Sequence, residues 1–315
     1  MEKIEARVLH RPAAVHGYLA EGPRALGPGR LAWITIQCGM ASKHGALHVL
    51  NAARSENRTW LLPGRPGFVF ATNRDSVFLL GMERSVGLYD THTHRFEELV
   101  SGIDAHTTGT IVNDAVLCAA GLVFGCKDTA FRDKKAGLWF LRRKDLKLVA
   151  LRKDQLCSNG KVVRELPGGK LELFDIDSPA RVVARYELDV ERATCTAPTI
   201  AIDLRDERGV PDGMVLVPGT DEVVIAMFDP EPAASGRALQ CSLRTGARVR
   251  EFVTPGAAQV TCPQWLPGHS GTQLVLTTAA EHLTAERLAQ QPNAGCLFVA
   301  PVSLAKAPYA PIWTC

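Results

Sequence analysis

The 315-residue sequence contains no apolar run that approaches the roughly 20 residues needed for a membrane-spanning helix. Residues 1–7 are rich in charge, and no apolar core of a signal peptide follows them. We therefore expect a soluble, unexported protein of the cytoplasm.

Runs of like charge are also missing. The 36 Lys and Arg residues are spread among 33 Asp and Glu residues, which leaves a net charge of +3. A protein that binds nucleic acid or a membrane surface gathers its basic residues in a patch or stripe. We expect neither partner here, and a small-molecule substrate instead. The sequence leaves open whether the protein is a monomer or a small homo-oligomer.

The nine cysteines include no C-x-x-C pair and no histidine spacing typical of a zinc site. Most lie in apolar stretches, where a free thiol packs as a small hydrophobic side chain. This usage favours a reducing compartment. A single catalytic thiol stays an alternative, although no cysteine has an obvious base beside it.

Long helical periodicity is nearly absent, aromatic residues make up only 6%, and short aliphatic strands recur along the whole chain. Their pattern repeats six times. The repeats can be counted from anchor residues 46 to 53 positions apart, each opening a segment: Glu21, Gly67, Asn113, Asn159, Asp212 and Cys262.

About ten residues after each anchor comes a strongly apolar strand, at residues 31–36, 77–80, 122–125, 171–174, 223–226 and 274–277. Third strands are expected at residues 45–50, 85–89, 136–141, 180–186, 236–240 and 294–299, and fourth strands at 59–62, 96–100, 146–150, 199–202 and 247–253. The sixth unit lacks a fourth strand, and residues 6–11 are left over to supply it. Six four-stranded units closed in this way predict an all-β, six-bladed β-propeller that forms one domain over residues 1–315. A large sandwich or two small β domains would not explain the even spacing.

The first residues of each innermost propeller strand lie near the central axis, so the anchors should converge there. Four of the six carry side-chain oxygens. Two carboxylates with one or two amide oxygens form a site suited to Ca²⁺ or Mg²⁺ and tolerant of Mn²⁺ or Zn²⁺. The alternative is that Asn-Asp, Asn-Gly and Asp-Gly serve only as turn pairs.

Several phrases carry a family resemblance. They are Leu19-Ala-Glu21-Gly-Pro, Cys157-Ser-Asn159-Gly with Phe174-Asp-Ile-Asp177-Ser, Gly209-Val-Pro-Asp212-Gly-Met214, Val260-Thr-Cys262 with Leu274-Val-Leu-Thr-Thr, and Gln291-Pro-Asn-Ala-Gly295. In this order and spacing the sequence resembles the family of senescence marker protein-30, gluconolactonases and luciferin-regenerating proteins.

The resemblance implies one divalent cation, with Ca²⁺ as the first choice, held by Glu21, Asn159 and Asp212. It also implies hydrolysis of sugar lactones or other esters. The cation would polarise the carbonyl, and Asp212 would activate the attacking water as general base. Asn113 would lie beside the metal and help to hold substrate or water.

The departures from the family pattern concern the substrate pocket. Sugar lactonases of the family often have an arginine where this chain has Ile111, and the Asn-Asp-Gly phrase has become Asn-Asp-Ala115. Lys127 and Asp128 stand where the family expects apolar and then acidic residues, and we expect them, with His106 on the preceding loop, to line the pocket. Such a pocket favours a less hydroxylated ligand than a sugar lactone.

The leading hypothesis is therefore a cytoplasmic, divalent-metal-dependent hydrolase of lactones or related esters. Two alternatives stay open: a non-catalytic metal-binding propeller, and an enzyme that performs non-hydrolytic chemistry on an unusual metabolite in the same pocket.

Overall fold

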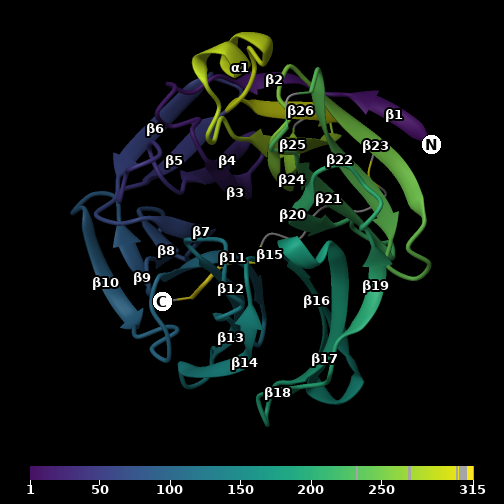
Figure 1. The fold of residues 1–315 in the computed structure, drawn as a ribbon. Coiled ribbons are helices and arrows are strands. Elements are labelled where there is room, and N and C mark those ends of the chain that lie inside the picture. The colour runs from purple at the N-terminus through teal and green to yellow at the C-terminus, as the bar shows by residue number, and fades with distance from the viewer. Residues whose placement is uncertain (232, 269–270, 303, 305–310, 315) are drawn as a thin grey trace.

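The computed structural model describes residues 1–315 except 232, 269–270, 303, 305–310 and 315. Six β-sheets are arranged around a central axis, as Figure 1 shows. The predicted six-bladed β-propeller is confirmed. No helix among the described residues is long and apolar enough to cross a membrane.

The first three blades follow one another along the chain, and each is a four-stranded antiparallel sheet. Blade 1 consists of β3 (Ala20–Gly27), β4 (Arg30–Thr35), β5 (Ala46–Asn51) and β6 (Glu56–Leu61). Blade 2 consists of β7 (Pro66–Ala71), β8 (Val77–Met82), β9 (Ser85–Asp90) and β10 (Arg95–Val100). Blade 3 consists of β11 (Thr110–Cys118), β12 (Gly121–Asp128), β13 (Ala136–Arg142) and β14 (Lys147–Gln155).

The fourth and fifth blades carry additions. Blade 4 has β15 (Ser158–Leu166), β16 (Lys170–Asp177) and β17 (Val182–Asp189), and β17 pairs with both β18 (Thr194–Cys195) and β19 (Thr199–Asp203). The 3₁₀ turns η1 (Pro167–Gly169) and η2 (Ser178–Ala180) flank β16. Blade 5 has β20 (Val210–Leu216), β21 (Glu222–Phe228), β22 (Ser235–Ser242) and β23 (Arg248–Pro255).

The N-terminal segment closes the ring. Blade 6 contains β24 (Val260–Gly268), β25 (Gly271–Thr278) and β26 (Leu297–Pro301), and β2 (Arg7–His10) pairs antiparallel with β26 as its fourth strand. This confirms the predicted closure. The sequence did not predict β1 (Glu2–Glu5), which adds a parallel strand to β23 of blade 5, or the short helix α1 (Ala285–Gln290) between β25 and β26. Ala6, between β1 and β2, is buried against side chains of blades 5 and 6.

Burial explains why some strands have apolar sequences and others have polar ones. The second strand of each blade is covered on both faces by neighbouring blades, so β8 is buried along its whole length and reads as a continuous apolar run. The outermost strand β6 has mostly exposed side chains and is correspondingly polar. The eight described cysteines form no disulfide, and six of them are buried.

The innermost strands touch one another around the axis at the anchor residues. A Cβ added to Gly67 of blade 2 would lie 2.5 Å from the Asn113 carbonyl oxygen of blade 3. A Cβ at Gly160 would likewise lie 2.7 Å from the Asp212 carbonyl oxygen of blade 5, and one at Gly213 would lie 2.6 Å from Cys262 Sγ of blade 6. Thr261 Oγ1 completes the ring by donating to the Ala20 carbonyl oxygen of blade 1 at 2.6 Å.

Substitution of Gly67 by alanine should therefore destabilise the propeller, because the new methyl group meets backbone atoms that cannot rotate away. Overpacking of this kind lowers the free energy of unfolding by about 1–3 kcal/mol, which denaturant titration measures. Gly64→Ala is the matched control, since its Cβ would meet only the flexible side chains of Glu83 and Met82. Equal stability losses in the two variants would contradict the close approach at the axis.

Candidate active site

A register change in every innermost strand presents the anchors to the axis. The pairing of β11 with β12 shifts between Val112 and Ala115, and that of β15 with β16 between Ser158 and Lys161. Corresponding shifts occur beside Glu21, Gly67, Asp212 and Cys262. A bulge of this type turns a side chain out of the regular alternation of the strand, so the repeated bulges place the same repeat position at the centre six times.

Two carboxylates meet at this level, Glu21 from blade 1 and Asp212 from blade 5. Burial, with the charges of Asp212 and Asp114, raises the pKa of Glu21 well above its usual range. Burial also raises the pKa of Asp212, although the ammonium of Lys127 opposes the shift. Within the part of the chain that the structure describes, neither carboxylate accepts a hydrogen bond or forms an ion pair. Both groups therefore lack a positive partner.

Asn113 and Asn159 form a hydrogen-bonded chain next to the carboxylates. Asn113 Nδ2 donates to Asn159 Oδ1 at 2.6 Å and to the Ser158 carbonyl oxygen at 3.0 Å. Asn159 Nδ2 donates to Ser178 Oγ at 2.8 Å. These contacts fix the Asn159 amide and leave one lone pair of its oxygen without a donor. Asn113 thus acts on Asn159 directly.

The thiol of Cys157 lies next to the same amides. Its Sγ atom is 3.5 Å from Asn159 Nδ2 and 3.9 Å from Asn113 Nδ2. Burial raises the pKa of this thiol. A protonated thiol is a poor nucleophile, so the position of Cys157 beside the site does not favour a catalytic cysteine.

A buried ion pair also holds Asn159 in place, and no feature of the sequence indicated it. Lys161 and Asp175 are 0% and 1% exposed, and their Nζ and Oδ1 atoms lie 3.1 Å apart. Lys161 Nζ also donates to the backbone oxygen of Asn159. Ser158 and Gln155 donate to the Asp175 carboxylate. These two charge partners are 14 residues apart on neighbouring strands, and such a pair follows no local sequence pattern.

Lys127 lies on β12, in register with Ile111 on β11. Ile111 is buried in an apolar cluster with Leu19, Ile34 and Ala279. Side chains of such cross-strand neighbours lie on the same face of the sheet. The basic side chain of Lys127 therefore lies next to Ile111. At this position, sugar lactonases of the family that the sequence resembles often have arginine.

Asp128 and His106 take part in a loop network. Burial opposes ionisation of Asp128, but the backbone N–H groups of Asp133, Arg132 and Ala130 donate to it and lower its pKa to about 2. Lys135 Nζ lies 3.2 Å from the same carboxylate. His106 is exposed, and its Nε2 lies 3.2 Å from the Lys135 carbonyl oxygen. Asp128 thus organises residues 129–135, and its hydrogen-bonding capacity is used within that loop.

Glu281 is a further acidic residue of the site that the sequence did not indicate. It follows β25 on the segment that leads to α1, and its charge raises the pKa of both Glu21 and Asp212. Gln259 fixes its backbone through hydrogen bonds of 2.8 and 2.9 Å. The segment has no counterpart in the other repeats, so the repeat pattern could not reveal it.

The residues present fit a divalent cation. Two carboxylates without hydrogen-bond donors and an amide oxygen with a free lone pair are hard-oxygen ligands. Among the described residues, no group of three or more His, Cys, Asp and Glu side chains is arranged to hold a metal. The expected set contains only two such residues, because its third member, Asn159, is an amide.

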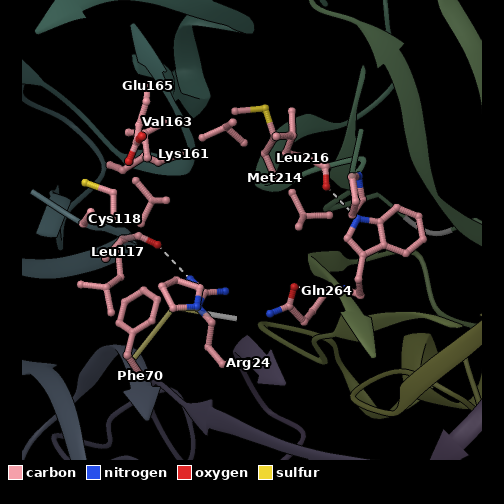
Figure 2. Close-up of a pocket in the computed structure, with 18 of the residues that line it drawn as sticks. Arg24, Phe70, Leu117, Cys118, Lys161, Val163, Glu165, Met214, Leu216 and Gln264 are labelled. Atoms are coloured by element: carbon pink, nitrogen blue, oxygen red, sulfur yellow. Dashed lines mark hydrogen bonds between the residues drawn. The ribbon is translucent and has the colours of Figure 1, made fainter. Parts of the chain in front are cut away.

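A cavity of about 480 Å³ occupies the channel beyond the bulges (Figure 2). It is lined by the later residues of the innermost strands, among them Arg24, Lys161, Met214 and Gln264, and does not include the two axial carboxylates. Arg24, one of the lining residues, stacks on Phe70, 4.8 Å from the ring centre, and pairs with Asp114 at 3.3 Å.

Comparisons with known proteins agree with this geometry. The model of the SMP-30/gluconolactonase/LRE-like region matches residues 19–280. The chain belongs to the SMP-30/gluconolactonase/LRE-like family. Membership of this family supports a lactone hydrolase.

Individual relatives are distant. The chain is 24% identical over 273 residues to a Bacillus subtilis (strain 168) protein named putative sugar lactone lactonase YvrE, covering 86% of this chain and 87% of that one. It is 28% identical over 125 residues to Danio rerio regucalcin, a match that spans 40% of each protein. A crystal structure of regucalcin from Agrobacterium tumefaciens, titled a calcium-binding protein, superposes with a TM-score of 0.80 at 20% identity and covers 99% of both chains.

The loop role of Asp128 generates a pH-dependent prediction. A lowered pKa means that the ionised carboxylate stabilises the folded state above the unfolded pKa of roughly 4, and that this contribution is lost as the pH falls toward 2. Asp128→Asn should therefore lower the free energy of unfolding by about 1–3 kcal/mol at pH 7, and the difference from wild type should shrink below pH 4. Denaturant titrations at pH 7 and pH 3 test this, with the exposed Asp75→Asn as control. A difference that stays constant between these pH values would contradict it.

Proposed function

We propose that the chain is a divalent-cation-dependent hydrolase of lactones or related esters, with the cation held by Glu21, Asn159 and Asp212. The observation that carries this proposal is the pair of axial carboxylates, Asp212 buried and Glu21 partly buried, that have no hydrogen-bond donor or ion-pair partner among the described residues. Two such groups repel each other unless a cation lies between them. The fixed Asn159 oxygen beside them supplies a third ligand of the same hard type.

The names of relatives support the same proposal. The Bacillus subtilis relative is named a putative sugar lactone lactonase, and the Agrobacterium tumefaciens protein is titled calcium-binding. Ca²⁺ is therefore the first choice, with Zn²⁺, Mn²⁺ and Mg²⁺ as alternatives that the same oxygen ligands accept.

The chemistry can be assigned to residues of this chain. The bound cation would polarise the scissile carbonyl and stabilise the charge that develops on its oxygen. Asp212, ionised once its charge is balanced, would accept a proton from the attacking water as general base. Asn113 would hold the Asn159 amide in place through their 2.6 Å hydrogen bond. These groups lie on inner strands that are each hydrogen-bonded to a neighbouring strand, and such positioning favours catalysis.

Replacement of Asp212 tests the general base and the ligand together. Asp212→Asn should lose at least about 100-fold in kcat/KM on a panel of lactones and aryl esters, because the amide cannot accept the proton. Its content of bound divalent metal, measured by elemental analysis after dialysis, should fall as well. Asp206→Asn, an exposed carboxylate on the loop before β20, is the matched control.

The possible outcomes separate the functions. Full activity of Asp212→Asn would overturn the proposed role of Asp212. A wild-type protein that binds metal through Asp212 but hydrolyses nothing in the panel would instead be a non-catalytic metal-binding propeller.

Metal binding should also release protons. Because the pKa values of Glu21 and Asp212 are raised, the metal-free site retains protons at a pH where exposed carboxylates are ionised. A cation must displace them, so its affinity should rise with pH above the range in which exposed carboxylates ionise. Calorimetric titration in two buffers of different ionisation enthalpy measures the number of protons released. Metal binding without proton release would place the cation at a different site.

A further inference from the structure

We propose that Lys127 selects substrates that carry an anionic group, such as a carboxylate, next to the lactone or ester bond. This inference rests on the proposed hydrolase function of the axial site and names the chemical class of its substrate. Four observations carry it: the face on which Lys127 lies, its backbone contact with blade 4, its lack of a partner and the charge balance of the axis.

The strand geometry directs Lys127 toward the axial site. Residues two apart on a strand share a face, and Lys127 lies two residues after Gly125. A Cβ on Gly125 would come within 2.1 Å of Ser158 Oγ in blade 4, so this face is turned toward the strand that carries Asn159. The backbone of Lys127 also forms a β-bridge with Cys157.

The ammonium of Lys127 lies within electrostatic reach of both axial carboxylates. Its charge lowers the pKa of Asp212 more than any other group does, and it acts on Glu21 in the same sense. The same charge acts on the buried thiol of Cys157. These effects agree with the position that the strand geometry gives.

Other basic side chains around the axis already have carboxylate partners. Arg24 pairs with Asp114 at 3.3 Å, Lys161 with Asp175 at 3.1 Å, and Lys135 with Asp128 at 3.2 Å. Lys127 is only partly exposed, and across the described residues it makes no side-chain hydrogen bond or ion pair. A partly buried ammonium without a partner loses hydration that an anionic ligand can replace.

The charge balance points the same way. A divalent cation would balance Glu21 and Asp212, and Arg24 balances Asp114. Lys127 then remains as a positive charge on blade 3. Glu281 comes from blade 6, on the opposite side of the ring (Figure 1), and forms no ion pair with Lys127 among the described residues. The blade 3 side of the axial site therefore favours the anionic end of a substrate.

The test compares two lactones that differ in one group. One carries a ring carboxylate and the other carries the corresponding carboxamide, and both are assayed with the metal-loaded wild type, Lys127→Met and Lys127→Arg. The wild type should favour the carboxylate by about 10- to 100-fold in kcat/KM, mainly through KM, and the preference should decline with added salt. Lys127→Met should lose the preference, and Lys127→Arg should retain it.

Lys134→Met is the matched control, because Lys134 is an exposed lysine on the loop that follows β12. It should keep the wild-type preference. Metal content of each variant is measured in parallel, so that a change at the cation site is not mistaken for a change in substrate selection. A preference for the carboxylate that is equal in the wild type and Lys127→Met would overturn the inference, as would the absence of a preference in the wild type.

The inference and the proposed function fail in different ways. If the metal-loaded wild type hydrolyses neither lactone nor any other ester, the hydrolase proposal fails. Calorimetric binding of the same two lactones, which are then inert ligands, still decides the role of Lys127. Tighter binding of the carboxylate that Lys127→Met abolishes supports selection by Lys127, and equal affinity for the two lactones contradicts it.

Discussion

At three interfaces between blades, the innermost strands approach each other so closely that no room remains for a β-carbon between them. Glycine at positions 67, 160 and 213 permits this approach, because a β-carbon at any of them would overlap the next strand. The rest of the site depends on it. The contacts fix the level at which each strand bulges, and the bulges bring side chains from distant parts of the sequence to one place.

Electrostatics at the axis follows from this geometry. Asp212 is buried and Glu21 is partly buried, so their charges are screened less from each other than they would be in water. Other charged groups near the axis form ion pairs with each other, namely Lys161 with Asp175 and Arg24 with Asp114. Among the described residues, Glu21, Asp212 and Lys127 form no side-chain hydrogen bond or ion pair. Unbalanced buried charge is costly to the folded state and is typical of groups that serve binding or catalysis.

Much of the fold could be predicted from the sequence, because a propeller repeats one structural unit and each unit shows the same order and spacing of apolar strands. The strand 223–226 reads like the strand 77–80, and both are buried from two sides. The single-copy features could not be predicted this way. Strand β1, helix α1 and the segment with Glu281 occur once, and their positions depend on tertiary contacts that no local pattern encodes.

The candidate site shows the same division. The anchors Glu21, Asn113, Asn159 and Asp212 were identified because matched repeat positions converge at an axis. The residues that support them, Asp175 and Ser178, were not, since their relation to Asn159 arises from strand pairing and a 3₁₀ turn. Asp128, which the sequence predicts to line the pocket, also accepts hydrogen bonds from backbone N–H groups of the loop that follows it, a relation that the repeat pattern does not show.

The N-terminal closure has a consequence for how the chain folds. Strand β2 precedes blade 1 in the chain, whereas its partner β26 follows blade 5 and the first two strands of blade 6. Contacts between residues so far apart in sequence form slowly, since a long loop must close first. During synthesis blades 1 to 5 can assemble, but β2 has no partner until residues 297–301 emerge. The ring is thus completed in one late step that pairs β2 with β26, and a product truncated before residue 297 would leave unpaired edges on β2 and β25.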